Sequence, residues 1–148
     1  MSATVITGAN RGIGLELARQ CIQRGDRVIA GCRNPDEAQE LKDLSPTSLL
    51  PIDVGDEESV HSFSEAINED ITLLINNAGT SISNMGFERE EVGVLDAPVD
   101  LTLDMIRING LSAATVTRSL ADRLGSGSQV VNVTSPVSYT HLTLPTKA

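Results

Sequence analysis

The sequence predicts an α/β fold in which helices cover both faces of a doubly wound, parallel, five-strand sheet. The first observation is that short apolar runs alternate with amphipathic stretches along the chain. The second is a glycine-rich stretch, TGANRGIG at residues 7–14, which lies between the first apolar run and the first amphipathic stretch. Strand–helix–strand connections of this kind are right-handed and leave successive strands parallel.

The expected strands are residues 3–7, 27–31, 48–52, 71–75 and 129–134. The spacing of apolar residues predicts helices over residues 12–24, 56–67 and 101–124. A polar helix is expected over residues 35–44, because Pro35 is favoured in a first turn. Pro51 indicates an edge strand, because proline has no N–H to donate to a neighbouring strand. Residues 71–75 are almost continuously apolar, which is typical of a central parallel strand. The first helix is expected to bury one stripe of residues: Ile13, Leu17, Ala18, Cys21 and Ile22.

The glycine-rich turn is expected to bind a diphosphate. Gly8 permits the tight turn, Gly12 lets the backbone come close to the diphosphate, and Gly14 lets the helix pack close to the strand. The free N–H groups and the positive dipole end of the helix then face the phosphates. A tight turn that binds nothing is the alternative, but the strand–turn–helix context favours a ligand.

Composition and charge exclude several classes of function. The net charge of −9 argues against a nucleic-acid partner, because phosphate neutralisation needs clustered lysine and arginine. No apolar run has the length of a membrane span, and no leader pattern precedes the first strand, so we expect a cytoplasmic protein. Cys21 and Cys32 are not spaced as a metal pair, so we expect two reduced thiols and no metal site.

Four further motifs lie where one family places them. NNAG at residues 76–79 follows the fourth strand, Asp53 and Val54 follow the third, Asn109 lies in the last helix, and Thr134 and Ser135 end the fifth strand. With the glycine-rich turn, these motifs resemble the short-chain dehydrogenase/reductase family over nearly the whole chain. RGIGL at residues 11–15 and CRN at residues 32–34 are most similar to its carbonyl-reductase-like branch. The resemblance implies that residues 1–135 form an incomplete NADP-binding Rossmann domain.

The resemblance also implies site residues. The cofactor-binding residues would be Thr7, Gly8, Asn10, Arg11, Gly12, Ile13, Gly14, Arg33, Asp53, Val54, Asn77, Ala78 and Gly79. Asp53 would accept a hydrogen bond from the adenine amino group, and a helix N-cap or a solvated loop acid is its alternative role. Asn77 would lie near the adenosine ribose and hold the fourth strand to its neighbours. Ser135 would be catalytic, with its hydroxyl on the substrate carbonyl. Asn109 would hold a water in a proton relay, or would be a buried asparagine bonded to neighbouring backbone.

The end of the second strand indicates NADP(H) rather than NAD(H). An NAD-binding protein of this class needs an acid there, which accepts a hydrogen bond from the ribose 2′-hydroxyl. This chain has Cys32, followed by Arg33, and Arg11 adds a second cation in the glycine-rich turn. Two guanidinium groups can hold a 2′-phosphate. The alternative is two surface arginines that make no specific contact.

The last segment departs from the family pattern. The family's general acid is a tyrosine followed four residues later by a lysine. Tyr139 comes only four residues after Ser135 and is followed by Thr143, whereas Lys147 is eight residues away, so neither role is assigned. Residues 136–148 resemble a translated sequencing adapter, and we expect a non-native tail there. A genuine short strand is the alternative.

We therefore expect the parent protein to be an NADP(H)-dependent oxidoreductase that transfers a hydride between the cofactor and a small carbonyl or alcohol substrate. This fragment is expected to be inactive alone. A non-catalytic NADP(H)-binding regulator on the same scaffold is the alternative, and a stand-alone half-domain would require a genuine tail. The helix predicted over residues 101–124 is apolar on more than one face, which predicts a homo-oligomer or cover by protein not present here.

Overall fold

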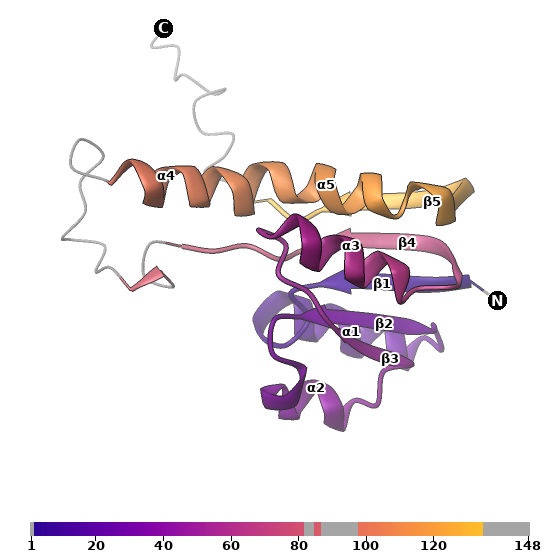
Figure 1. The fold of residues 1–148 in the computed structure, drawn as a ribbon. Helices are drawn as coiled ribbons and strands as arrows, with labels where there is room; N and C mark the ends of the chain where they lie inside the picture. The colour runs from indigo at the N-terminus through magenta and orange to yellow at the C-terminus, as the bar shows by residue number, and fades with distance from the viewer. Residues whose placement is uncertain (1, 82–84, 87–97, 135–148) are drawn as a thin grey trace, which may run out of the picture.

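The computed structural model describes residues 2–81, 85–86 and 98–134 of the chain. Within them, one parallel sheet has the strand order β3-β2-β1-β4-β5 (Figure 1). Its strands are β1 (Ser2–Thr7), β2 (Val28–Cys32), β3 (Ser48–Pro51), β4 (Asp70–Asn76) and β5 (Leu124–Asn132). The order reverses between β1 and β4, as in a doubly wound sheet, so the predicted fold class is confirmed.

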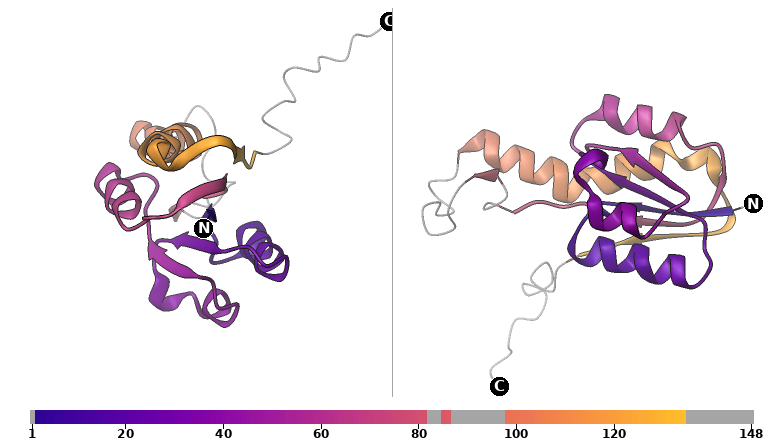
Figure 2. Two further views of the ribbon diagram at one scale, coloured as in Figure 1. Left: turned by 90° about the vertical axis from the view of Figure 1, so that its right-hand side faces the viewer. Right: turned by 90° about the horizontal axis from the view of Figure 1, so that it is seen from below.

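Helices cover both faces of the sheet (Figure 2). They are α1 (Gly12–Gln23), α2 (Gln39–Asp43), α3 (Glu57–Glu65), α4 (Val99–Ile106) and α5 (Ser112–Ser119). On one face, α1 and α2 bury a cluster that includes Ala18 and Leu41. On the other face, α3 and α5 bury a second cluster around Phe63 and Val116. The two clusters hold the sheet rigid, so its carboxyl edge is a fixed frame for the loops that follow each strand.

The pattern of β3 and α3 agrees with the expectation. β3 pairs only with β2 among the described strands, which confirms the edge position that Pro51 indicates. α3 begins after Asp56, whose Oδ1 accepts a hydrogen bond from the N–H of Glu58 at 3.0 Å, a normal N-cap. Val60, Phe63 and Ile67 are all buried, as their helical spacing predicts.

The last predicted helix and strand were wrong in their bounds. The helix is not regular from 101 to 124: α4 leads into one π-helical turn, Arg107–Leu111, and α5 ends at Ser119. We call Arg107–Leu111 the widened turn. β5 begins at Leu124, five residues earlier than predicted, because Leu124 already pairs with Ile71 of β4, and the register shifts between this pair and the next one, Leu73 with Gln129. It ends at Asn132 rather than residue 134.

Two further predictions needed correction. Residues 35–44 do not form one helix: a short 3-10 turn, Pro35–Glu37, is separated from α2 by Ala38, whose backbone is not helical. Ile13 is 64% exposed rather than buried, because it lies in the first turn of α1, at the carboxyl edge of the sheet and beyond the core. Leu15 is buried instead. Most of residues 80–99, which show no element in the sequence, lie outside the described residues.

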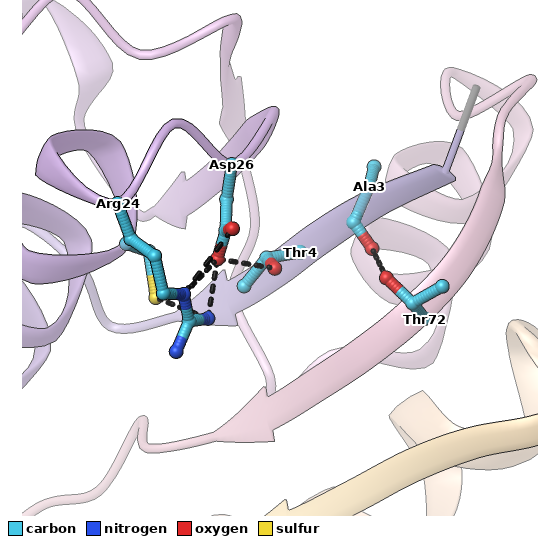
Figure 3. A network of polar contacts seen from close by, with 6 residues as sticks. Ala3, Thr4, Arg24, Asp26 and Thr72 are labelled. Carbon is cyan, nitrogen blue, oxygen red and sulfur yellow. Dashed lines mark hydrogen bonds and ion pairs between the residues drawn. The ribbon is translucent and has the colours of Figure 1, made fainter.

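A polar network ties the end of α1 to the start of β1 (Figure 3). The guanidinium of Arg24 donates from Nε to both carboxylate oxygens of Asp26, at 3.1 and 3.3 Å. The hydroxyl of Thr4, a buried residue of β1, donates to the same carboxylate at 3.4 Å. Hydrogen bonds from Arg24 hold the pKa of Asp26 below its ordinary value.

The sign of this shift predicts how stability depends on pH. A carboxyl group whose pKa is lowered by folding stabilises the protein above the unfolded pKa of about 3.9, and loses this contribution as the pH falls below it. Asp26→Asn should therefore lower the free energy of unfolding at neutral pH, and the deficit should shrink in acid. Urea unfolding at both pH values measures it. Asp36→Asn is the control, because that side chain is fully exposed and lies 4.0 Å from Lys42; an equal deficit of Asp26→Asn at both pH values would contradict the prediction.

Candidate functional site

The glycine-rich turn lies at the carboxyl end of β1. Gly8 has φ +66° and Gly12 has φ +56°, in the left-handed region that favours glycine. A Cβ on Gly8 would lie 2.8 Å from the Cα of Ala78, so this part of the turn is closely packed. A Cβ on Gly12 would meet no atom within 4 Å. The start of α1 thus faces open space, and the turn residues Asn10, Arg11 and Ile13 are also exposed there.

Gly14 marks the closest approach of α1 to this turn. A Cβ there would lie 2.2 Å from the carbonyl oxygen of Gly8 and 2.4 Å from Nδ2 of Asn77. No side chain fits in this space without movement of backbone. The first turn of α1 is therefore held directly against the chain that leaves β1.

Asn77 joins the end of β4 to the same turn. Its Nδ2 donates to the carbonyl oxygens of Thr7 at 3.1 Å and Gly8 at 3.0 Å. In return, the buried Oγ1 of Thr7 accepts hydrogen bonds from the N–H groups of Asn77 and Ala78, both at 3.1 Å. These four bonds satisfy polar groups that would otherwise be costly to bury, and they fix the chain ends of β1 and β4 to each other.

Asp53 lies in a tight turn after β3. Its Oδ1 accepts a hydrogen bond from the N–H of Gly55 at 2.9 Å, and its own N–H donates to Oγ of Ser59 at 2.8 Å. Val54 is buried and anchors this turn in the core, whereas Asp56, not Asp53, caps α3. No described residue donates a hydrogen bond to Oδ2 of Asp53, so one carboxylate oxygen is available to a ligand.

Arg11 and Arg33 lie on adjacent loops. Thr7 pairs with Gly31 in the register of β1 and β2, so the turns after these strands lie at the same edge. Both arginines are exposed, and neither guanidinium group forms a hydrogen bond or ion pair with another described residue. Burial raises the pKa of the Cys32 thiol, so the end of β2 carries no negative charge at neutral pH. This edge of the sheet therefore presents unpaired positive charge.

The widened turn carries Asn109. Its Oδ1 accepts a hydrogen bond from the N–H of Thr80 at 2.8 Å, and its Nδ2 donates to the carbonyl oxygen of Thr80 at 3.0 Å. Both ends of the amide are thus occupied by the backbone N–H and C=O groups of one residue, Thr80, in the chain after β4. The sequence left two roles open for Asn109, a water-holding residue in a proton relay or a buried asparagine bonded to neighbouring backbone. The structure shows its side chain bonded to backbone, but the residue is exposed rather than buried. A Cβ on Gly79 would lie 3.3 Å from the same Oδ1.

The comparisons with known proteins agree with this geometry. The chain matches the family model described as short chain dehydrogenase over residues 2–144. It belongs to the short-chain dehydrogenase family. The chain is 31% identical to Retinol dehydrogenase 11 of Mus musculus, over 88% of this chain and 42% of that protein. It is 30% identical to (+)-neomenthol dehydrogenase of Arabidopsis thaliana, over 88% and 52%.

Solved structures of short-chain dehydrogenases share the fold. A carbonyl reductase from Pseudomonas aeruginosa PAO1 has a TM-score of 0.84 and 26% identity, over 96% of this chain and 65% of that chain. A structure titled as that reductase in complex with NADP has a TM-score of 0.83 and 25% identity, over 96% and 64%. The chain thus spans about two thirds of these structures and about half or less of the two curated relatives.

Sequence reasoning missed the role of Asn76 in this short-chain dehydrogenase. Its buried Nδ2 donates to Oγ1 of Thr117 on α5 at 3.1 Å and to Oδ1 of Asn132 on β5 at 2.9 Å. Its carbonyl oxygen accepts from the N–H of Val133 at 2.9 Å. Asn76 thus joins β4 to β5 and to α5 at the carboxyl edge of the sheet. A polar residue at the end of an apolar strand was the available signal.

The remaining residues that the sequence predicts for the site lie outside the described part of the chain. Ser135, Tyr139 and Lys147 lie among the residues that are not described, so their roles stay predictions. A hollow at the amino end of the sheet is lined by Arg27, Asn68, Glu69 and Asp70, far from the loops that carry the site. Its arginine is paired with Glu69 at 2.6 Å. Within the described ranges, no group of side chains has the makeup of a metal site, and no helix is long and apolar enough to cross a membrane.

Proposed function

We propose that this chain is the NADP(H)-binding part of a reductase of carbonyl compounds, or of the reverse alcohol dehydrogenase. The preference for NADP(H) rests on two arginines whose guanidinium groups have no ion-pair partner among the described residues, Arg11 and Arg33. Both lie near Cys32, which is uncharged at neutral pH. A guanidinium group binds phosphate through two parallel hydrogen bonds, whereas an acid at the end of β2 would repel the 2′-phosphate. The NADP complex of the reductase from Pseudomonas aeruginosa supports the same choice.

The residues present fit such a cofactor along its length. The open space at Gly12 and the start of α1 accommodate the diphosphate, which the N–H groups of the helix start then bind. The available Oδ2 of Asp53 accepts the adenine amino group, and the clamp made by Asn77 keeps both loops in place. When bound, the cofactor supplies the hydride.

The catalytic assignments follow the family resemblance. Ser135 donates a hydrogen bond to the substrate carbonyl oxygen, where negative charge develops as the hydride arrives. The amide of Asn109 is engaged by Thr80, so a relay water is held by backbone groups of the widened turn rather than by this side chain. π-helical turns of this kind are frequent at functional sites.

The proposal also covers the oligomeric state and the cellular location of the parent protein. The helix from Val99 to Leu111 exposes Val99, Leu103, Ile106 and Leu111, each more than half exposed. An apolar surface of this kind supports a homo-oligomer through this helix, or cover by further parts of the parent chain. We place the parent protein in the cytoplasm.

The missing tyrosine–lysine pair favours a second function for this chain alone, namely cofactor binding without turnover. Tyr139 has Thr143, not lysine, four positions later. The family's lysine lowers the pKa of its general acid, and the uncharged threonine at position 143 does not supply that charge. The expected result is that NADPH binds but is not oxidised when carbonyl compounds are added.

Cofactor binding by the purified chain is the direct test. The chain has no tryptophan, so the fluorescence of a reduced nicotinamide is measured without background from the protein. We expect NADPH to bind at least about 10-fold more tightly than NADH, because a charge-assisted phosphate contact contributes roughly 1.5–3 kcal/mol. Equal affinities would contradict the arginine assignment, and binding of neither nucleotide would refute the proposed function.

A further inference from the structure

The widened turn touches two loops that belong to different ends of the proposed cofactor site. Asn109 holds the peptide of Thr80, after β4, through two hydrogen bonds. The preceding residue, Ile108, packs against the core cluster on this face and lies against Gly55, in the turn after β3. One turn of helix therefore contacts both the turn after β3 and the chain after β4.

Gly55 is the point of contact on the adenine side. A Cβ on Gly55 would lie 3.1 Å from Cγ1 of Ile108, 3.6 Å from its Cδ1 and 3.3 Å from Oδ1 of Asp53. The space beside the Cα of Gly55 is thus bounded by both the isoleucine side chain and the carboxylate. Its N–H donates to that same Oδ1 at 2.9 Å, so the position of Gly55 sets the orientation of the carboxylate.

The rest of the turn leaves little else to fix the carboxylate. The backbone of Asp53 is held by Ser59 and by the N–H of Asp56, which donates to its carbonyl oxygen at 3.2 Å. The side chain has only the bond from Gly55 among the described residues. Ile108 is in turn supported by α5, whose buried Val116 belongs to the same core cluster.

We propose that Ile108 is a positioning residue for base recognition: by holding Gly55, it aims the Asp53 carboxylate at the amino group of the adenine base. The inference rests on the proposed function, since it assumes that a dinucleotide binds here. It assigns part of the base selectivity to a side chain that acts through Gly55 and not through a hydrogen bond of its own to the base.

The test compares two nucleotides that differ only in the base, at this amino group and at the adjacent N1, which carries a proton in hypoxanthine. Reduced nicotinamide hypoxanthine dinucleotide phosphate has the same 2′-phosphate and diphosphate as NADPH, but a carbonyl oxygen replaces the amino group. The wild-type chain should prefer NADPH by about 10-fold or more. With the hypoxanthine analogue, the Asp53 carboxylate loses the amino group that donates to it and faces a carbonyl oxygen instead. In Ile108→Ala the preference should fall to about twofold, since the carboxylate is no longer aimed.

Matched variants separate positioning from general loosening of the fold. Ile22→Ala removes the same atoms from a partly buried isoleucine on the opposite face of the sheet, and should keep the wild-type preference. In the double variant Gly55→Ala with Ile108→Ala, the new methyl group occupies part of the emptied space. Its preference should lie nearer the wild-type value than that of Ile108→Ala alone.

The outcomes distinguish this inference from the function on which it rests. If the wild-type chain binds neither nucleotide, the proposed function fails. If the wild-type chain binds both equally, or if Ile108→Ala weakens both by the same factor, the function stands and the inference is overturned. Should Ile108→Ala fail to fold, Ile108→Val keeps Cγ1 and loses Cδ1, and its preference must fall below that of the wild type.

Discussion

Replacing Arg33 with alanine is expected to remove most of the preference for NADPH over NADH. The guanidinium follows the end of β2, where Cys32 is buried and uncharged, and no described residue pairs with it. Its loss should raise the Kd for NADPH by about 10- to 100-fold, equivalent to a charge-assisted hydrogen bond of roughly 1.5–3 kcal/mol. The Kd for NADH should change by less than about twofold, because NADH has no 2′-phosphate.

Arg19→Ala is the control for this prediction. Arg19 lies on α1, is partly exposed, and forms an ion pair with Glu16 of the same helix. The substitution Arg19→Ala removes the same charge as Arg33→Ala, so it measures any general effect of net charge on the binding of an anionic ligand. If Arg19→Ala and Arg33→Ala weaken NADPH equally, the 2′-phosphate is not recognised by Arg33.

Gly14→Ala and Gly110→Ala should have opposite effects on stability, although both replace a glycine in a helix. Alanine normally stabilises a helix by about 1 kcal/mol relative to glycine. At Gly110 the new Cβ would meet no atom within 4 Å, so this gain should be seen. At Gly14 it would lie 2.2 Å from the carbonyl oxygen of Gly8, and overpacking should cost at least about 2 kcal/mol.

Urea unfolding followed by circular dichroism measures both changes. Gly14→Ala should also weaken NADPH, because α1 must move away from the turn that Gly8 and Asn77 hold. Gly110→Ala leaves that turn untouched and serves as the matched control. A Gly14→Ala chain as stable as Gly110→Ala would show that the start of α1 adapts without cost, which contradicts the packing described above.

The elements that the sequence predicts well are those whose own pattern decides their structure. β1 to β4 are apolar runs of strand length, and α3 has both an N-cap and a buried stripe. The first half of β5 has no such pattern: Gly125 and Gly127 are typical of a loop, and in the structure they lie in the irregular stretch between two residues that pair with β4, Leu124 and Gln129. Tertiary contacts of this kind are not visible in local sequence.

The candidate site divides in the same way. The glycine-rich turn, the loop at Asp53 and the clamp at Asn77 lie where their motifs place them, because each follows the end of a well-predicted strand. The widened turn and its contacts with Gly55 and Thr80 depend on how a helix crosses two distant loops. Gly110, a poor residue within a helix, was the only local sign of irregularity.

The widened turn also sets the phase of the helix that contains it. The steps from Leu101 to Leu120 number 19, about 1,900° of rotation, which in a regular α-helix leaves the two side chains roughly 100° apart. A π-helical turn takes up one residue without advancing the rotation, so both residues return to one face, and both are buried. A helix one residue shorter would bury the same leucines. The core therefore does not require the extra residue, and what it adds to the molecule is the reach of Ile108 and Asn109 to the loops on either side.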